Sequence, residues 1–292
     1  MQKIREFPLQ GVIGIVANAM EEVDLAVANK LLCVEIRADL LLDSGLSTDD
    51  LIDTINRSKS SGLAVLFTLR HPTHGGKFSG SEEQRASISR QALQAGADLI
   101  DLEWDTKAAQ LLHDERSHLV LSYHDFNGMP GKSDLATLTG RMCSDNPAAI
   151  KIVPTASTLQ DAVRMLEWVA VPGDSNDVTR IGFAMGPMGT CSRVLTLAHG
   201  APITYASFGK AVAPGQVEMD ALLTLYRVNE MTADTTVVAI AGQASVVDER
   251  AAVLNQQYGA QQVNQVAIAF PNVPVDELET HSQSLRISEI IS

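Results

Sequence analysis

Cysteine is scarce in this chain. The three cysteines, Cys33, Cys143 and Cys191, lie far apart in the sequence, and none belongs to a C-x-x-C pair. An odd number of widely spaced cysteines predicts neither a disulfide framework nor a zinc site. The cysteine content therefore favours a reduced, cytoplasmic setting.

Long apolar segments and an excess of basic residues are missing as well. No run approaches the roughly 18 apolar residues that a membrane-spanning helix needs, and the opening MQKIREFPLQ lacks the apolar centre of a secretory signal. The formal net charge of -13 argues against a nucleic acid or an anionic membrane surface as the partner. We expect a cytoplasmic protein.

The chain also lacks the common nucleotide-binding loops. No G-x-G-x-x-G follows the first predicted strand, and no Walker-type loop is present. These absences remove the usual reasons for an open, doubly wound sheet.

Strand and helix patterns alternate along most of the chain. Apolar segments rich in β-branched residues occur at 11–18, 31–40, 62–70, 97–105, 117–126, 148–154, 179–186 and 201–209. Helical patterns separate them, and Ser47, Ser81 and Thr158 are candidate N-caps. Eight apolar strands joined by helices predict an α/β fold with a closed (β/α)₈ TIM barrel.

The pattern restarts after a helix predicted at 216–230. A strand at 235–242, a helix at 245–259 and a strand at 263–270 follow. We therefore predict a catalytic barrel over residues 1–230 and a small β-α-β appendage over 231–292. The appendage is too short for an ordinary independent domain.

Polar residues gather where the predicted barrel strands end, which is where barrel enzymes carry out their chemistry. They are Glu35, Arg37, Asp39, Arg70, Asp101, Glu103, Asp105, His124, Asp125 and Lys151, with Arg193 and Gln216 in the last two loops.

Taken singly, these residues have ordinary structural explanations. Arg37 is expected to pair with Glu35 or Asp39, His124 to be a hydrogen-bonded core histidine, and Lys151 to extend toward solvent from an edge strand. Their convergence at one end of the predicted barrel favours a functional site.

Several arginines around one pocket suggest an anionic, hydroxyl-rich substrate, because guanidinium binds carboxylate through two parallel hydrogen bonds. Burial and nearby positive charge favour the neutral amine of Lys151. A neutral amine attacks carbonyl groups, so the residues predict an imine-forming lysine with His124 as the proton shuttle.

Seven ordered motifs resemble those of type I 3-dehydroquinate dehydratase over about residues 11–230. They are VEIRADL, FTLRHPTHGGKF, DLIDLEWD, LSYHDF, IKIVPTAS, GFAMGPMGTCSRV and ITYASFGKAVAPGQ. The resemblance implies a (β/α)₈ barrel, a homodimer, and the dehydration of 3-dehydroquinate to 3-dehydroshikimate in the shikimate pathway. It implies no cofactor and no metal.

The resemblance also assigns roles to individual residues. Lys151 matches the lysine that forms a Schiff base with the substrate ketone, and His124 matches the histidine that takes the C2 proton and helps the C1 hydroxyl leave. The residues that match substrate-binding positions are Glu35, Arg37, Arg70, Arg193 and Gln216, with Met185 and Tyr205 as walls over the ring.

Two positions depart from the family pattern. His74 stands where the family usually has a glutamate that orients and tunes the catalytic histidine, so we expect His74 to modulate His124. Val212 replaces a serine and removes one hydrogen bond to substrate, worth on the order of 1 kcal/mol.

The appendage resembles the opening of shikimate dehydrogenase. Of the pair of substrate-binding serines expected there, only Ser245 remains. It is interpreted as a truncated domain without redox activity, or as a decoration for packing or dimerisation.

For the barrel, the alternatives are another imine-forming lyase or aldolase, a metal-dependent enzyme using Glu35, Glu103 and His124 with His71 and His74, and a catalytically weakened scaffold.

Overall fold

The eight predicted strands form one parallel, curled sheet in a computed structural model that describes residues 7–18, 20–171, 178–209 and 217–292. The strands are β1 (Gly11–Val16), β2 (Cys33–Arg37), β3 (Ala64–Thr68), β4 (Leu99–Glu103), β5 (Leu119–Asp125), β6 (Ala149–Pro154), β7 (Thr179–Gly182) and β8 (Ile203–Ser207).

The order of the strands confirms the barrel. It runs β7-β6-β5-β4-β3-β2-β1-β8, with a short β9 (Val217–Glu218) at the end. The last barrel strand thus lies beside the first, with Gly11 opposite Ile203 and Ile15 opposite Ser207. Among the described residues, no strand ladder joins β7 to β8. The chain folds as a (β/α)₈ barrel.

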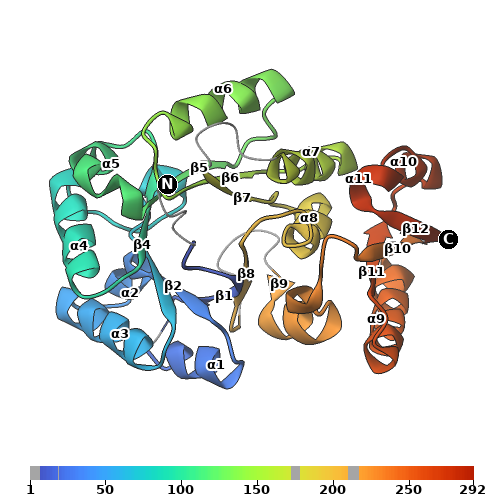
Figure 1. Cartoon of the computed structure of the whole chain (residues 1–292), viewed down its shortest axis with the longest axis horizontal. Helices are drawn as coiled ribbons and strands as arrows, with labels where there is room; N and C mark the ends of the chain where they lie inside the picture. Colours follow the sequence, from blue (N-terminus) through green and yellow to red (C-terminus); the bar gives the residue numbers. More distant parts are fainter. Residues whose placement is uncertain (1–6, 19, 172–177, 210–216) are drawn as a thin grey trace, which may run out of the picture.

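Helices surround the strands (Figure 1). They are α1 (Glu22–Ala28), α2 (Ala38–Asp43), α3 (Thr48–Ser60), α4 (Glu82–Gln94), α5 (Lys107–Leu111), α6 (Lys132–Cys143), α7 (Leu159–Ala170) and α8 (Thr190–Leu195). The predicted caps are confirmed for α3, α4 and α7. The hydroxyls of Ser47, Ser81 and Thr158 each accept a hydrogen bond from the backbone N–H three residues on, within a complete capping box.

Alternation along each strand divides the core in two. On β6, Ile150 and Ile152 pack against the helices, whereas Ala149 and Val153 join the cluster inside the barrel. Successive side chains of a strand point to opposite faces, so Lys151 points inward with Ala149 and Val153. Glu35 likewise points inward on β2, two residues after Cys33 of the inner cluster.

The helix predicted at 216–230 is wrong in its extent. The described part consists of β9, a π-helical turn at Ala221–Leu225 and a 3₁₀ turn at Val228–Glu230. Arg227 interrupts it with a left-handed backbone, φ 49°. The Arg227 guanidinium donates to the carbonyls of Asn255 at 2.7 Å and Gln265 at 2.9 Å. Contacts with the appendage therefore compete with continuation of the helix.

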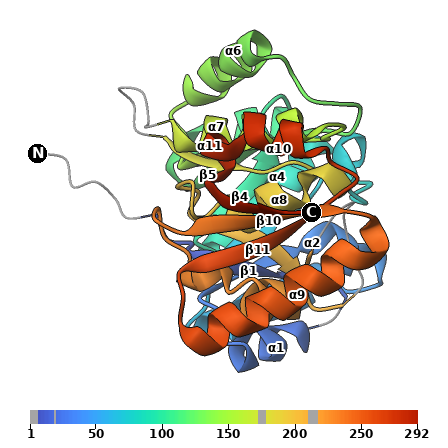
Figure 2. The same ribbon diagram turned by 90° about the vertical axis from the view of Figure 1, so that its right-hand side faces the viewer.

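The predicted appendage is confirmed in its first three elements and continues beyond them (Figure 2). The predicted elements are β10 (Thr236–Gly242), α9 (Ala244–Gln261) and β11 (Gln265–Pro271), and the additional ones are α10 (Val275–Thr280), α11 (Ser282–Leu285) and β12 (Ile287–Ile291). All three strands are parallel, in the order β11-β10-β12. Strand β12 was not predicted from the sequence.

The appendage packs against the barrel near α7 and α8 (Figure 1). Buried Leu278 and Leu285 belong to the same apolar cluster as the helix-facing core of the barrel. His199 Nε2 lies 2.9 Å from the carbonyl of Ser284, whose hydroxyl donates to Glu167 on α7 at 3.0 Å. The boundary at residue 230 stays a prediction, since the two parts share a core.

We expect Leu285→Ala to lower the free energy of unfolding by about 2–4 kcal/mol, because it removes a fully buried side chain where the appendage meets α7. Urea denaturation followed by tryptophan fluorescence is the measurement, because both tryptophans, Trp104 and Trp168, lie in the barrel. Val253→Ala, at a position that is 49% exposed on α9, is the control and should change stability by under about 0.5 kcal/mol. An unfolding transition seen by circular dichroism but not by fluorescence would contradict the expectation that the appendage and the barrel unfold together.

Candidate active site

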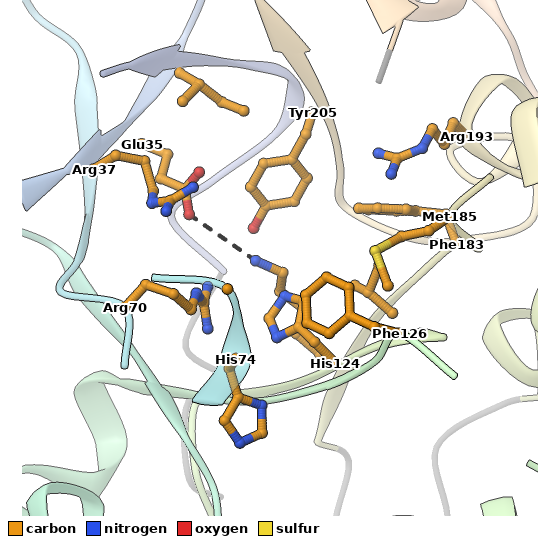
Figure 3. Close-up of a pocket in the computed structure, with 14 residues that line it drawn as sticks. Glu35, Arg37, Arg70, His74, His124, Phe126, Phe183, Met185, Arg193 and Tyr205 are labelled. Atoms are coloured by element: carbon orange, nitrogen blue, oxygen red, sulfur yellow. Dashed lines mark ion pairs between the residues drawn. The ribbon is translucent and has the colours of Figure 1, made fainter. Parts of the chain in front are cut away.

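The inner face of the barrel changes from apolar to polar along the strands. Residues near the strand beginnings, such as Leu66, Leu99 and Val120, form the inner apolar cluster. Farther along the same strands, the inward positions are polar, as at Thr68 and Asp101. Because the strands are parallel, these polar positions meet at one end. The pocket there is lined by Ile15, Glu35, Arg37, Arg70, His74, Gly75, His124, Phe126, Lys151, Val153, Phe183, Met185, Arg193 and Tyr205 (Figure 3).

Lys151 is buried in this pocket at 4% exposure. Its Nζ forms an ion pair with Asp101 Oδ2 at 2.9 Å and lies 4.0 Å from Glu35 Oε1, the pair marked by the dashed line in Figure 3. Nζ also lies 4.4 Å from the centroid of the Tyr205 ring. From the sequence we expected positive neighbours for Lys151. The described charged groups that contact it are carboxylates, because alternation places Asp101 and Glu35 on the same inner face.

Asp101 connects Lys151 to Arg70. Arg70 NH1 lies 3.0 Å from Asp101 Oδ1 and donates to Ser122 Oγ at 2.8 Å, while the Ser122 hydroxyl donates to Asp101 at 2.6 Å. Burial alone would raise the pKa of the Asp101 carboxyl, but the charges of Arg70 and Lys151 outweigh it and hold this pKa below its ordinary value. Asp101 therefore stays ionised beside Lys151.

A second buried carboxylate fixes the other side of Arg70. Arg70 NH1 donates to Glu103 Oε1 at 3.1 Å, and Glu103 also pairs with Arg85, which is fully buried. Arg85 Nε donates to the carbonyl of Leu69 at 2.6 Å, at the end of β3. Burial opposes ionisation of Glu103, yet the charges of Arg70 and Arg85 lower its pKa. These contacts give Arg70 a structural role in addition to its place in the pocket.

His124 lies between two other rings at the end of β5. Its ring stacks on Phe126 with centroids 6.4 Å apart, and the ring of His74 stands edge-on at 6.3 Å. Within the described residues, His124 Nδ1 has no hydrogen-bond partner. Burial, followed by the charges of Arg70 and Lys151, lowers the pKa of His124 well below 6.5. A histidine in this position is unprotonated at neutral pH and able to accept a proton.

His74 approaches His124 from the 3₁₀ turn at Pro72–His74. The turn is held against the end of β3 by a glycine, because a Cβ on Gly76 would lie 2.0 Å from the carbonyl oxygen of Arg70. His74 Nε2 lies 3.7 Å from Asp105 Oδ1, and burial is the main cause of its lowered pKa. His74 therefore lies beside His124, and its modulating role stays a prediction.

The other arginines occupy different settings. Arg37 forms a two-point ion pair with buried Asp39, with both nitrogen–oxygen distances at 2.9 Å. Arg193, on α8, stacks over the Phe183 ring at 4.4 Å, and burial lowers its pKa to about 10. Arg193 therefore stays positively charged at neutral pH and presents a buried cation to the pocket.

The remaining predicted residues have mixed outcomes. Met185 and Tyr205 line the pocket as expected, next to Phe183. Gln216 and Val212 lie outside the described residues. No set of three His, Cys, Asp or Glu side chains placed to hold a metal ion occurs in the described part of the chain, and no helix there is long and apolar enough to cross a membrane.

The importance of Asp101 and the contribution of Phe126 and Phe183 were not predicted from the sequence. Asp101 was noted as a polar strand residue but not assigned to the site. A signal was available: Asp101 shares the inner face of β4 with Glu103, and β5 places Ser122 opposite both Glu103 and Lys151. The aromatic residues gave no such signal because apolar residues at strand ends usually serve the core.

Comparison with known proteins supports the resemblance. A family model described as type I 3-dehydroquinase matches residues 13–233. A 3-dehydroquinate dehydratase from Dehalococcoides mccartyi is 31% identical over 198 residues, or 66% of this chain and 84% of that protein. The bifunctional 3-dehydroquinate dehydratase/shikimate dehydrogenase of Arabidopsis thaliana is 30% identical over 263 residues, or 88% of this chain and 42% of the plant protein.

A solved structure of dehydroquinate dehydratase and shikimate dehydrogenase from S. pombe has a similar fold. Its TM-score is 0.63 at 21% identity, and the match covers 94% of this chain and 55% of that one. The plant and yeast proteins both pair a dehydratase with a shikimate dehydrogenase, in agreement with the resemblance noted for the C-terminal segment. Because the family model matches well over half of its length, this chain belongs to the type I 3-dehydroquinase family.

Proposed function

We propose that the barrel dehydrates 3-dehydroquinate to 3-dehydroshikimate through a Schiff base on Lys151, with His124 as the general acid and base. Membership of the family makes the chain a carbon–oxygen lyase with 3-dehydroquinate dehydratase activity. The observation that carries the mechanism is the buried Lys151 beside ionised Asp101, in the same pocket as an unprotonated histidine.

The lysine converts the substrate ketone into an electron sink. Its nitrogen adds to the ketone carbon, the ketone oxygen leaves as water, and a positively charged iminium forms. Asp101, 2.9 Å from Nζ, is the counter-ion for the ammonium before the reaction and for the iminium afterwards. The iminium then accepts the electrons released when the C2 proton is removed.

His124 transfers the protons in the elimination. Its low pKa keeps the imidazole free to take the C2 proton at neutral pH. The imidazolium so formed protonates the C1 hydroxyl, which leaves as water, and His124 returns to its starting state. Water then adds to the carbon of the product iminium and the carbon–nitrogen bond breaks, which releases 3-dehydroshikimate and restores the Lys151 ammonium.

The arginines and Glu35 bind the substrate. Arg193 is the proposed carboxylate partner because it is a buried cation stacked on an aromatic ring, the setting in which a charge-assisted pair is strongest. Glu35 already accepts a hydrogen bond from Thr68 at 2.7 Å and accepts another from a substrate hydroxyl. Arg37 and Gln216 complete the set that the resemblance assigns to substrate.

The appendage is proposed to support the barrel rather than to take part in the reaction. The described residues that line the pocket all lie between Ile15 and Tyr205, before the appendage begins. Its buried contacts with α7 make it part of the fold. The homodimer inferred from the resemblance stays a prediction.

The lysine is tested by borohydride reduction in the presence of 3-dehydroquinate, followed by intact mass measurement. We expect the wild-type chain to gain one reduced adduct, and Lys151→Ala to gain none and to lose at least about 10³-fold in kcat because covalent catalysis is removed. Lys132→Ala, at a side chain that is 74% exposed, should behave as wild type. A wild-type chain that turns over substrate but never traps an adduct would exclude the Schiff base.

The histidine is tested by separating imine formation from elimination. His124→Ala should still trap the adduct on Lys151, but kcat should fall by about 10²–10⁴-fold because no group takes the C2 proton. His113→Ala, at a side chain that is 60% exposed on the barrel surface, is the control. Normal turnover of the His124 variant would mean that another group is the base.

The effect of His74 is tested through the pH dependence of kcat/KM. His124 acts when unprotonated, so its pKa well below 6.5 should keep kcat/KM constant from pH 8 down to 6.5 and place the acidic limb lower. Arg70, Lys151 and Asp101 also face His124 and are unchanged by the test.

In His74→Glu, a carboxylate replaces the imidazole whose ring centroid lies 6.3 Å from that of His124. The acidic limb of the kcat/KM profile should move up by about one pH unit, because the negative charge favours the imidazolium form of His124. His113→Glu adds the same charge at a remote surface position and should leave the limb in place. A limb that does not move in His74→Glu would show that His74 does not influence His124.

A further inference from the structure

The Tyr205 hydroxyl is a buried polar group without a partner. Tyr205 lies on β8, is 4% exposed, and packs its ring against Phe183 with centroids 5.6 Å apart. Among the described residues, its hydroxyl oxygen makes no hydrogen bond. Figure 3 shows this hydroxyl pointing into the pocket, toward the space between Glu35 and His124.

Packing explains the ring of Tyr205 but not its hydroxyl. A phenylalanine would fill the same space and keep an aromatic face against Lys151 Nζ, which lies 4.4 Å from the ring centroid. A buried hydroxyl without a partner destabilises a folded protein, because it loses its hydrogen bonds to water. A hydroxyl kept at this cost and aimed into a pocket points to a ligand atom.

The electrostatics of the pocket indicate which ligand atom needs this donor. Lys151 Nζ lies between the carboxylates of Asp101 and Glu35. When the amine adds to a ketone, negative charge builds on the ketone oxygen, and both carboxylates repel it. Burial and the charges of Glu35 and Asp101 raise the pKa of Tyr205 well above its ordinary value, so the hydroxyl stays protonated as a neutral donor.

We propose that the Tyr205 hydroxyl donates a hydrogen bond to the oxygen on the carbon that Lys151 attacks, and so promotes formation of the Schiff base. This inference rests on the imine mechanism proposed above and adds to it a catalytic residue for the first step. It replaces the expectation that Tyr205 is only a wall over the substrate ring.

The step balances without another reactant. The Lys151 ammonium first gives up one proton, which frees the lone pair on its nitrogen. That lone pair forms the carbon–nitrogen bond as the carbonyl π electrons move to oxygen, and the oxygen takes up the released proton. The carbon–oxygen bond then breaks, the oxygen leaves as water with a second proton from nitrogen, and the nitrogen lone pair forms the C=N bond. An ammonium and a ketone thus become an iminium and water, and Tyr205 stabilises charge on the oxygen without being consumed.

The test compares Tyr205→Phe with wild type in three measurements. We expect kcat/KM for 3-dehydroquinate to fall by about 10–10³-fold, as when a hydrogen-bond donor to a developing oxyanion is removed. The rate of adduct formation, measured by rapid mixing followed by borohydride, should fall by the same factor. The midpoint of thermal unfolding should stay equal or rise, because the unpartnered hydroxyl is gone.

Tyr226→Phe is the matched control, since Tyr226 is partly buried outside the pocket, and it should retain wild-type kinetics. Tyr205→Phe with kcat/KM and adduct rate within two-fold of wild type would overturn the proposal. A loss of activity matched by a fall in the thermal midpoint would also overturn it, since the hydroxyl would then be structural. If wild type forms no adduct at all, the Schiff-base function itself fails, whatever Tyr205→Phe does.

Discussion

The ion pair between Lys151 and Asp101 is the interaction on which the rest of the pocket depends. A buried ammonium is unfavourable alone, and a buried carboxylate is equally so. Their contact at 2.9 Å, together with the bond from Arg70 to the other oxygen of Asp101, allows both to lie inside the barrel. Removing Asp101 would leave Lys151 and Arg70 without this compensation. The polar end of the barrel is therefore one connected network.

The network also explains how the same pocket serves two opposite chemical needs. In the proposed mechanism, Lys151 reacts with a ketone and then carries positive charge, and the ionised carboxylate of Asp101 favours that charge. His124 must stay unprotonated, and the charges of Arg70 and Lys151 keep it so. Asp101 lies close to Lys151, whereas the aromatic ring of Phe126 covers His124. Different surroundings within one cavity thus suit the two groups to different roles.

Local sequence patterns predicted the secondary structure where the hydrogen-bond partners of an element lie within that element. The capping residues Ser47, Ser81 and Thr158 start helices because the partners of their side chains lie three residues away. The prediction failed where residues distant in the sequence determine whether an element forms or continues. The helix expected at 216–230 is interrupted at Arg227, whose hydrogen-bond acceptors lie in α9 and β11, and β12 exists because β10 offers it a paired edge.

The sequence by itself determined the barrel and the group of polar residues at the strand ends, because the two-residue period of a strand and the parallel order of β-α units are local properties. Ordered motifs added the family and the proposed roles of Lys151 and His124. Only the tertiary structure decided which charges are partners. It placed Asp101 and Glu35 on Lys151, set His74 beside His124 and left the Tyr205 hydroxyl unpartnered among the described residues. These relations depend on distances between side chains of different strands, which curvature of the sheet fixes and residue order does not.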